Sequence, residues 1–456
     1  MASVSALNPV ERRASFSLAS IFALRMLGLF MIYPVFSLYT HDLPGATPFT
    51  IGVALGIYGL SQALLQLPFG IWSDRVGRRR VISIGLLLFA VGSVVAALSH
   101  TIWGIIIGRA LQGTGAIGAV MLAMVADLTR EEQRTKAMAF IGMSIGMSFA
   151  LAMVLGPVFN RWVHIEGIFW LTALMALAGL AILYFLVPAA PPQKLHRDTE
   201  AVPTLLWEVL KNRQLLRLDF GIFAQHAILT ATFLGLPQLL QQEGSVVAHQ
   251  WLLYLLVLAA SVVLMVPLII YGERKAQLKR IFLVAIAVTG VAQLLLAAGM
   301  HSLWLLVPVM ILFFTAFNLL ESTLPSLISR LAPAGMKGTA MGVYSSSQFL
   351  GIFVGGVAGG FIQQHWHYEA VFLFAAVLAL LWLLASWGLR NPGHVSTRTF
   401  ALGSLSGQPT EQTLKQLRAI PGVLDVALAL EDGSAILKVD NRKFDEAGLG
   451  ALLAGA

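Results

Sequence analysis

The 456-residue sequence contains no cysteine, and it has little charge. The absence of cysteine excludes disulfides, thiolate metal sites, cysteine nucleophiles and cysteine-linked lipid anchors. Asp, Glu, Lys and Arg together make up 11% of the residues, whereas soluble proteins contain about 25%. Since 57% of the residues are hydrophobic and the mean hydropathy is +0.80, an ordinary water-soluble globule is excluded.

The sequence contains many long apolar stretches. A membrane-spanning helix needs about 20 mostly apolar residues. The sequence has twelve such stretches, at 16–40, 48–71, 80–99, 102–126, 136–160, 167–189, 218–241, 250–271, 280–299, 302–329, 337–362 and 368–388. We therefore expect an all-α membrane protein with twelve spans.

The basic residues indicate how these spans are oriented. Arg75, Arg78, Arg79 and Arg80 follow the second stretch, Arg274 and its neighbours follow the eighth, and the other basic gaps also alternate. Cytoplasmic loops carry an excess of Lys and Arg. We thus expect a multi-pass protein of the cell inner (plasma) membrane with both termini in the cytoplasm. The net charge of +8 then reflects loop charge, and we expect no nucleic acid partner.

The chain divides into four parts. We expect an N-terminal six-helix bundle at 1–189, a cytoplasmic linker with an amphipathic helix at 190–217, and a C-terminal six-helix bundle at 218–390. Residues 397–456 are polar enough for a small cytoplasmic domain. Their pattern predicts the order βαββα, with strands near 397–401, 423–429 and 434–439 and helices near 410–419 and 443–454, as in ferredoxin-like domains.

The most specific motif lies between the second and third stretches. It reads Gly70-Ile-Trp-Ser-Asp74-Arg75-Val-Gly77-Arg78-Arg79-Arg80. This run resembles the loop 2–3 motif of the major facilitator superfamily, and the resemblance extends over about residues 16–390. It implies two six-helix bundles that transport a solute by alternating access.

The resemblance also implies a conformational latch at this loop. Asp74 is expected to accept hydrogen bonds at the N-terminus of the eleventh span, near Lys337, where an anion is favoured. Arg75 and Arg78 are expected to pair with acids, with Asp127 as the candidate. The alternative is a tight turn whose basic residues only set the topology.

Two further motifs resemble those of the family, and one of them points to its drug–proton antiporter branch. Arg109-Ala-Leu-Gln112-Gly113 resembles the R-x-x-Q-G motif of the family. The resemblance suggests that Arg109 tunes proton transfer, and the alternative is a structural arginine bonded to backbone carbonyls. Gly156-Pro157 in the fifth span matches part of the antiporter motif and predicts a kink or close packing. Gly351, Gly355 and Gly359 predict close packing of the eleventh span.

Three ionisable residues lie at similar depths in three different spans. An ionisable side chain that faces lipid costs free energy. We therefore expect Arg25, His226 and Glu321 to converge on a polar cavity. We interpret Glu321 as the protonatable group, His226 as its relay and Arg25 as the tuning charge. The alternative is a fixed Arg25–Glu321 ion pair. Polar residues that are candidates for the pathway are Tyr33, Gln62, Gln66, Ser144, Ser148, Gln225, Asn318, Tyr344 and Gln348.

The C-terminal segment resembles the cytoplasmic appendage of YajR-type major facilitators, on the run Leu417-Arg-Ala-Ile420-Pro-Gly422-Val423. It also resembles heavy-metal-associated domains. Those domains bind metal through Cys-x-x-Cys, which this sequence lacks, so we expect no metal. Either the domain regulates transport by docking on residues 75–80 or 274–280, or it is a stabilising appendage.

These observations favour a proton-driven exporter of hydrophobic or drug-like molecules. No nucleotide-binding motif G-x-x-x-x-G-K-[ST] is present, so the driving force is expected to be an ion gradient. The alternatives are a proton symporter that imports a small nutrient and a non-transporting membrane sensor. We expect no enzyme activity, no catalytic residues and no cofactor. The expected partners are a small-molecule substrate, protons and the lipid bilayer, and the expected form is a monomer.

Overall fold

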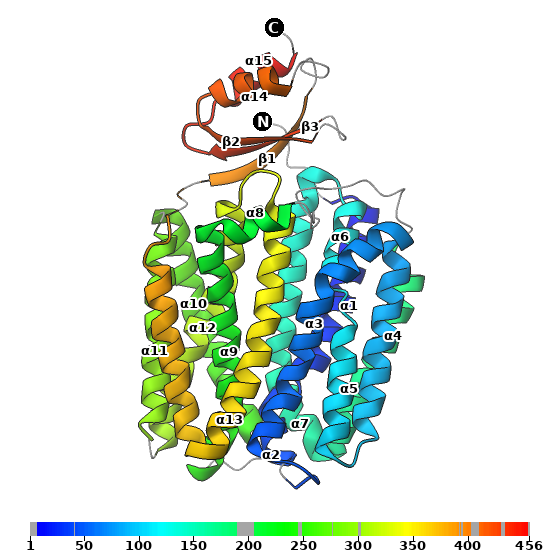
Figure 1. Ribbon diagram of the computed structural model, residues 1–456, viewed down its shortest axis with the longest axis vertical. Helices are drawn as coiled ribbons and strands as arrows, with labels where there is room; N and C mark the ends of the chain where they lie inside the picture. The colour runs from blue at the N-terminus through cyan, green and yellow to red at the C-terminus, as the bar shows by residue number, and fades with distance from the viewer. Residues whose placement is uncertain are drawn as a thin grey trace.

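Long helices stand side by side in the computed structural model, with a small sheet at one end (Figure 1). We call this end the sheet end and the opposite end, where α2 (Tyr33–Tyr39) lies, the far end. The structure describes residues 7–40, 42–188, 205–244, 249–275, 277–299, 302–391, 393, 395–402, 410–429 and 434–454. Residues 190–204 of the predicted linker lie outside the described residues.

The helices form an N-terminal and a C-terminal group. The N-half contains α1 (Pro9–Phe30), α2, α3 (Pro48–Val76), α4 (Arg78–Ala97), α5 (Ile102–Thr114), α6 (Gly118–Leu128) and α7 (Glu131–Phe185). The C-half contains α9 (Arg213–Gln242), α10 (Gln250–Lys275), α11 (Leu278–Ala297), α12 (Leu303–Leu331) and α13 (Lys337–Ser386). The short α8 (Leu206–Lys211) precedes α9 and occupies part of the predicted amphipathic helix.

Ten helices of the described chain are long and apolar enough to cross a membrane. The two longest, α7 and α13, have 55 and 50 residues, about 83 and 75 Å at 1.5 Å per residue, whereas the hydrocarbon core is about 30 Å thick. Both contain non-helical backbone, at His164 (φ 54°) in α7 and at His367 (φ 67°) in α13. These breaks fall between the predicted fifth and sixth spans and the predicted eleventh and twelfth spans, so each long helix has length for two crossings.

Glycines bring α13 close to both α9 and α3. A Cβ atom added to Gly351 would lie 2.2 Å from the Phe223 carbonyl oxygen, and one added to Gly355 would lie 2.3 Å from that of Ala227. One added to Gly52 in α3 would lie 2.1 Å from the Gly356 carbonyl oxygen. The predicted close packing of this helix is therefore found, and it joins the two halves.

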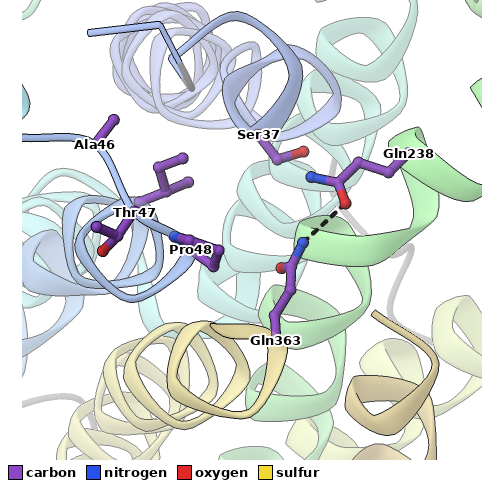
Figure 2. A pocket seen from close by; sticks show the side chains of 7 residues that line it. Ser37, Ala46, Thr47, Pro48, Gln238 and Gln363 are labelled. Carbon is purple, nitrogen blue, oxygen red and sulfur yellow. Dashed lines mark hydrogen bonds between the residues drawn. The ribbon is translucent and has the colours of Figure 1, made fainter. Parts of the chain in front are cut away.

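Contacts between the halves gather toward the far end. The rings of Tyr33 and Phe233 lie 5.8 Å apart, and those of Phe49 and Phe361 lie 6.5 Å apart. A cavity of about 200 Å³ remains there, lined by Ser37, Ala46, Thr47, Pro48, Ile51, Gln238 and Gln363 (Figure 2). Ligand pockets measure about 300–1,000 Å³, so this space is too small for a drug-sized molecule.

The C-terminal segment forms the predicted βαββα order. Its elements are β1 (Val395–Ala401), α14 (Thr410–Ala419), β2 (Val423–Ala429), β3 (Ser434–Asp440) and α15 (Glu446–Ala454). The antiparallel sheet has the order β1-β3-β2. Leu417 from α14, Leu437 and Val439 from β3 and Leu449 from α15 form a core separate from that of the long helices.

Candidate functional site: two polar clusters and a basic loop

The loop between α3 and α4 is organised around Arg78. Gly77 adopts φ +103°, a conformation that other residues rarely take. Arg78 is 5% exposed. Its Nη1 atom donates to the Ser73 hydroxyl at 2.7 Å and to the Asp74 carboxylate, and its Nε atom lies 3.3 Å from Asp127 Oδ2. The structure thus brings together three of the predicted latch residues, all from the N-half.

Other predicted latch residues lie apart from this network. Arg79 donates to the carbonyl oxygens of Leu183 and Val187 near the end of α7. Arg75 is exposed. A Cβ atom added to Gly70 would meet Ala119 at an ordinary 3.9 Å, so Gly70 is not at a tight helix contact in this structure.

Asp74 contacts its own loop and not the start of α13. The hydrogen-bond partner found for its carboxylate is Arg78, one helical turn later, and 29% of its side chain is exposed. The expected hydrogen bonds to the N-terminus near Lys337 are not found among the described residues. Because the halves meet toward the far end, Asp74 and α13 are not joined at the sheet end.

In the N-half, neutral groups hold two buried arginines. Arg25 is 1% exposed, and its Nη2 atom donates to Tyr58 Oη (2.9 Å), Gln62 Oε1 (2.7 Å) and the Gly115 carbonyl oxygen (2.9 Å). The expected convergence of Arg25 on Glu321 is therefore not found: the two side chains bond within opposite halves.

Arg109 is the second of these arginines. It is also 1% exposed, and it donates to Gln112 Oε1 at 2.9 Å and to the backbone carbonyl oxygens of Ala54 and Leu55. Gln112 in turn donates to the Ser93 hydroxyl at 2.7 Å. These bonds tie α5 to α3 and α4, which is the geometry of the structural alternative.

The fifth-span motif lies at a close helix contact. A Cβ atom added to Gly156 would be 2.2 Å from the Met31 carbonyl oxygen. Met31 follows α1 directly, and Tyr33 and Pro34 begin α2 there. Gly156, next to Pro157, therefore lets α7 approach the interruption between α1 and α2, and Tyr33 extends from this interruption to the C-half.

The C-half contains a second polar cluster, around Glu321 in α12. The Glu321 carboxylate accepts a hydrogen bond from Gln225 Nε2 at 2.9 Å and lies 3.9 Å from His226 Nε2. His226 is 2.8 Å from Gln348 Nε2 in α13. The Glu321 side chain is 36% exposed, although it lies about 15 Å inside α12 from Leu331. Three helices thus meet at one partly exposed carboxylate.

Two further pathway candidates flank this cluster. Asn318, almost one turn from Glu321, donates to the Ser261 hydroxyl of α10 at 3.0 Å. Tyr344, one turn from Gln348, is 4% exposed, and its hydroxyl has no hydrogen-bond partner in the described structure.

Sequence reasoning missed the buried acid Asp219. It is 5% exposed in α9. Its position at the second residue of the predicted span suggested a membrane boundary, but α9 begins at Arg213. An acidic residue inside an apolar helix could have identified Asp219 as a candidate. It was overlooked because the helix was predicted to start too late in the sequence.

The C-terminal domain docks on the loop between α12 and α13. Lys438 Nζ donates to the Ala332 carbonyl oxygen at 3.1 Å, and the Ala334 amide donates to Asp425 Oδ2 at 3.0 Å. Ile436 packs near Ala334. Burial lowers the pKa of the Lys438 ammonium, against the opposing effect of Asp425. This surface differs from both loops that the sequence suggested.

A salt bridge extends this contact to a neighbouring helix. Arg330 at the end of α12 pairs with Glu273 of α10 at 2.7 Å and donates to the Gly393 carbonyl oxygen at 3.4 Å. In the described part of the chain, no three His, Cys, Asp or Glu side chains group as a metal site requires.

Comparisons with known proteins agree with this architecture. The model of the Major Facilitator Superfamily matches residues 18–356 and, in an overlapping match, 220–430. The inner membrane transport protein YajR of Escherichia coli strain K12 is 45% identical over 437 residues, 96% of each chain. The multidrug resistance protein MdtH of Aeromonas salmonicida is 28% identical, over 75% of this chain and 85% of that protein.

A solved structure shares the fold. The crystal structure of the nucleoside transporter NupG superposes with a TM-score of 0.67 at 14% identity, over 82% of this chain and 98% of that one. The chain therefore belongs to the major facilitator superfamily, and it is a membrane transporter and not an enzyme.

Proposed function

We propose that this protein is a proton-coupled transporter that exports hydrophobic or drug-like small molecules from the cell by alternating access. The single observation that carries the proposal is the Glu321 cluster: a partly exposed carboxylate inside a spanning helix, bonded by Gln225 and next to His226. Such a group is costly in a membrane unless it serves transport. The multidrug resistance relative supports the substrate class.

The proposal includes the topology that the sequence predicted. The breaks at His164 and His367 turn the ten long helices into twelve crossings, arranged as bundles 1–189 and 218–390 joined by the linker 190–217. The sheet end, which carries the ferredoxin-like domain 397–456, is cytoplasmic, as are both termini. A location in the inner membrane is supported by the Escherichia coli relative, which is an inner membrane transport protein.

In this arrangement the structure corresponds to a state open to the cytoplasm. Support comes from the glycine and ring contacts at the far end and from Asp74, whose carboxylate contacts Arg78 and not α13. In the outward-open state, the halves rock together at the sheet end and Asp74 reaches the N-terminus of α13 at Lys337. Arg78 and Asp127 hold the loop in position for that contact.

Reconstitution into liposomes with an acidic lumen tests the function. An antiporter accumulates ethidium or tetracycline in the lumen as protons leave, whereas a symporter requires acid outside. Glu321→Gln keeps the side-chain size and the acceptor for Gln225, and we expect it to abolish accumulation. Glu208→Gln is the matched control, since Glu208 is exposed on α8. Wild-type accumulation by Glu321→Gln would contradict the proposal.

A further inference from the structure

Asp219 is a buried acid to which the function proposed above assigns no role. It lies seven residues before His226 on α9, so both side chains occupy the same face of the helix. Two helical turns, about 10 Å, separate them along the axis, with Asp219 nearer the sheet end. Asp219 thus lies between the Glu321 cluster and the end of the bundle that we assign to the cytoplasm.

The surroundings of Asp219 offer its charge no compensation. Both carboxylate oxygens are buried, and neither has a hydrogen-bond partner in the described structure. Arg217, two residues earlier, binds the Gly388 carbonyl oxygen. An ionised carboxylate buried without a partner is strongly disfavoured. The group therefore binds a proton or a cation during at least part of the transport cycle.

A tyrosine connects this acid to the Glu321 cluster. Tyr344 lies about one helical turn before Gln348 on α13, which contacts His226 at 2.8 Å, and its hydroxyl lies within electrostatic range of both Asp219 and Glu321. It is buried and forms no hydrogen bond in the described structure. Tyr344 is the titratable group of the packed helix α13 that interacts with Asp219, and Arg217 and His226 are its ionisable neighbours on its own helix.

We propose that Asp219 is a second proton-binding site, through which protons pass between Glu321 and the cytoplasm by way of the Tyr344 hydroxyl. In this step the Glu321 carboxylic acid donates its proton to Tyr344 Oη while the Tyr344 O–H proton moves to the Asp219 carboxylate. Glu321 becomes a carboxylate, Tyr344 stays neutral and Asp219 becomes a carboxylic acid. This inference rests on the proposed role of Glu321.

Chemical labelling of the full-length protein tests the site without a known substrate. Dicyclohexylcarbodiimide modifies protonated carboxyl groups in apolar surroundings, and peptide mass spectrometry locates the adducts. We expect adducts at Asp219 and Glu321 and none at the exposed Glu208, with labelling that decreases as pH rises. Glu321→Gln should retain the Asp219 adduct. An adduct at Glu321 without one at Asp219 would overturn the inference, whereas adducts at neither residue would overturn the proposed function.

Transport separates a proton-transfer role from a structural one. With ethidium as the probe, we expect Asp219→Asn and Tyr344→Phe to slow proton-driven accumulation by about tenfold or more and to shift its dependence on cytoplasmic-side pH. The Glu321 adduct should persist, which shows that the variants fold. Asp219→Glu should restore much of the rate. If Asp219→Asn keeps the wild-type rate and pH profile while Glu321→Gln loses accumulation, the proposed role of Asp219 is refuted and the proposed function is not.

Discussion

The two buried polar clusters, one in each half of the bundle, are built around residues of opposite charge. In the N-half, Arg25 and Arg109 each donate to three oxygen atoms, all of them neutral. In the C-half, Glu321 has one hydrogen bond from Gln225, and Asp219 has none in the described structure. A guanidinium cannot readily lose its proton, whereas a sparsely bonded carboxyl can exchange one. The comparison therefore assigns structural support to the N-half cluster and proton exchange to the C-half cluster.

The largest expected effect breaks the N-half cluster. Arg25→Met leaves Gln62 Oε1, Tyr58 Oη and the Gly115 carbonyl oxygen without their buried donor. At about 1–3 kcal/mol for each unsatisfied group, we expect a loss of at least about 3 kcal/mol. The apparent Tm of the purified protein, measured by tryptophan fluorescence, should fall by several degrees. An unchanged Tm would show that the N-half arginine is not structural.

The corresponding C-half change should leave stability nearly unchanged. In Glu321→Gln the amide oxygen still accepts from Gln225, and no charge remains buried. We expect the apparent Tm to stay within the range of a surface substitution, about 0.5 kcal/mol. Should this variant lose as much stability as Arg25→Met, the difference between the halves would disappear.

A smaller effect is expected at the loop. Arg78 and Asp127 are both buried and in contact, so a double-mutant cycle of Arg78→Ala and Asp127→Ala should give a coupling energy of about 1–3 kcal/mol. The exposed Arg75→Ala provides the control, with no coupling to Asp127. Additive effects at Arg78 and Asp127 would mean that the contact does not order the loop.

The sequence predicted the elements better than it predicted the contacts. Apolar stretches, turn residues and the alternating strands of the C-terminal segment are local signals, and the observed elements follow them closely. Arg78 and Asp127 are 49 residues apart, yet the loop motif brought them together correctly because both lie at the same end of adjacent helices. Arg25 and Glu321 lie at similar depths yet bond within opposite halves, because equal depth does not specify which way a helix faces.

The smallest effect concerns the docked C-terminal domain. Asp425→Asn weakens the bond to the Ala334 amide by removing its charge, and we expect about twofold faster hydrogen exchange in residues 332–338. Glu446→Gln, on the opposite part of the domain, is the control.

Because burial lowers the pKa of Lys438, docking releases protons. Docking should therefore tighten as pH rises toward the ordinary lysine pKa and loosen as it falls; exchange that is independent of pH there would contradict this contact.

Proton release on substrate binding tests most directly whether the C-half cluster exchanges protons. Ethidium is added to the detergent-purified protein in weak buffer, and a pH indicator reports protons released per protein. The account predicts release from the wild type and from Arg25→Lys, and none from Glu321→Gln. Equal release from Glu321→Gln and the wild type, or loss of release only in the arginine variant, would contradict it.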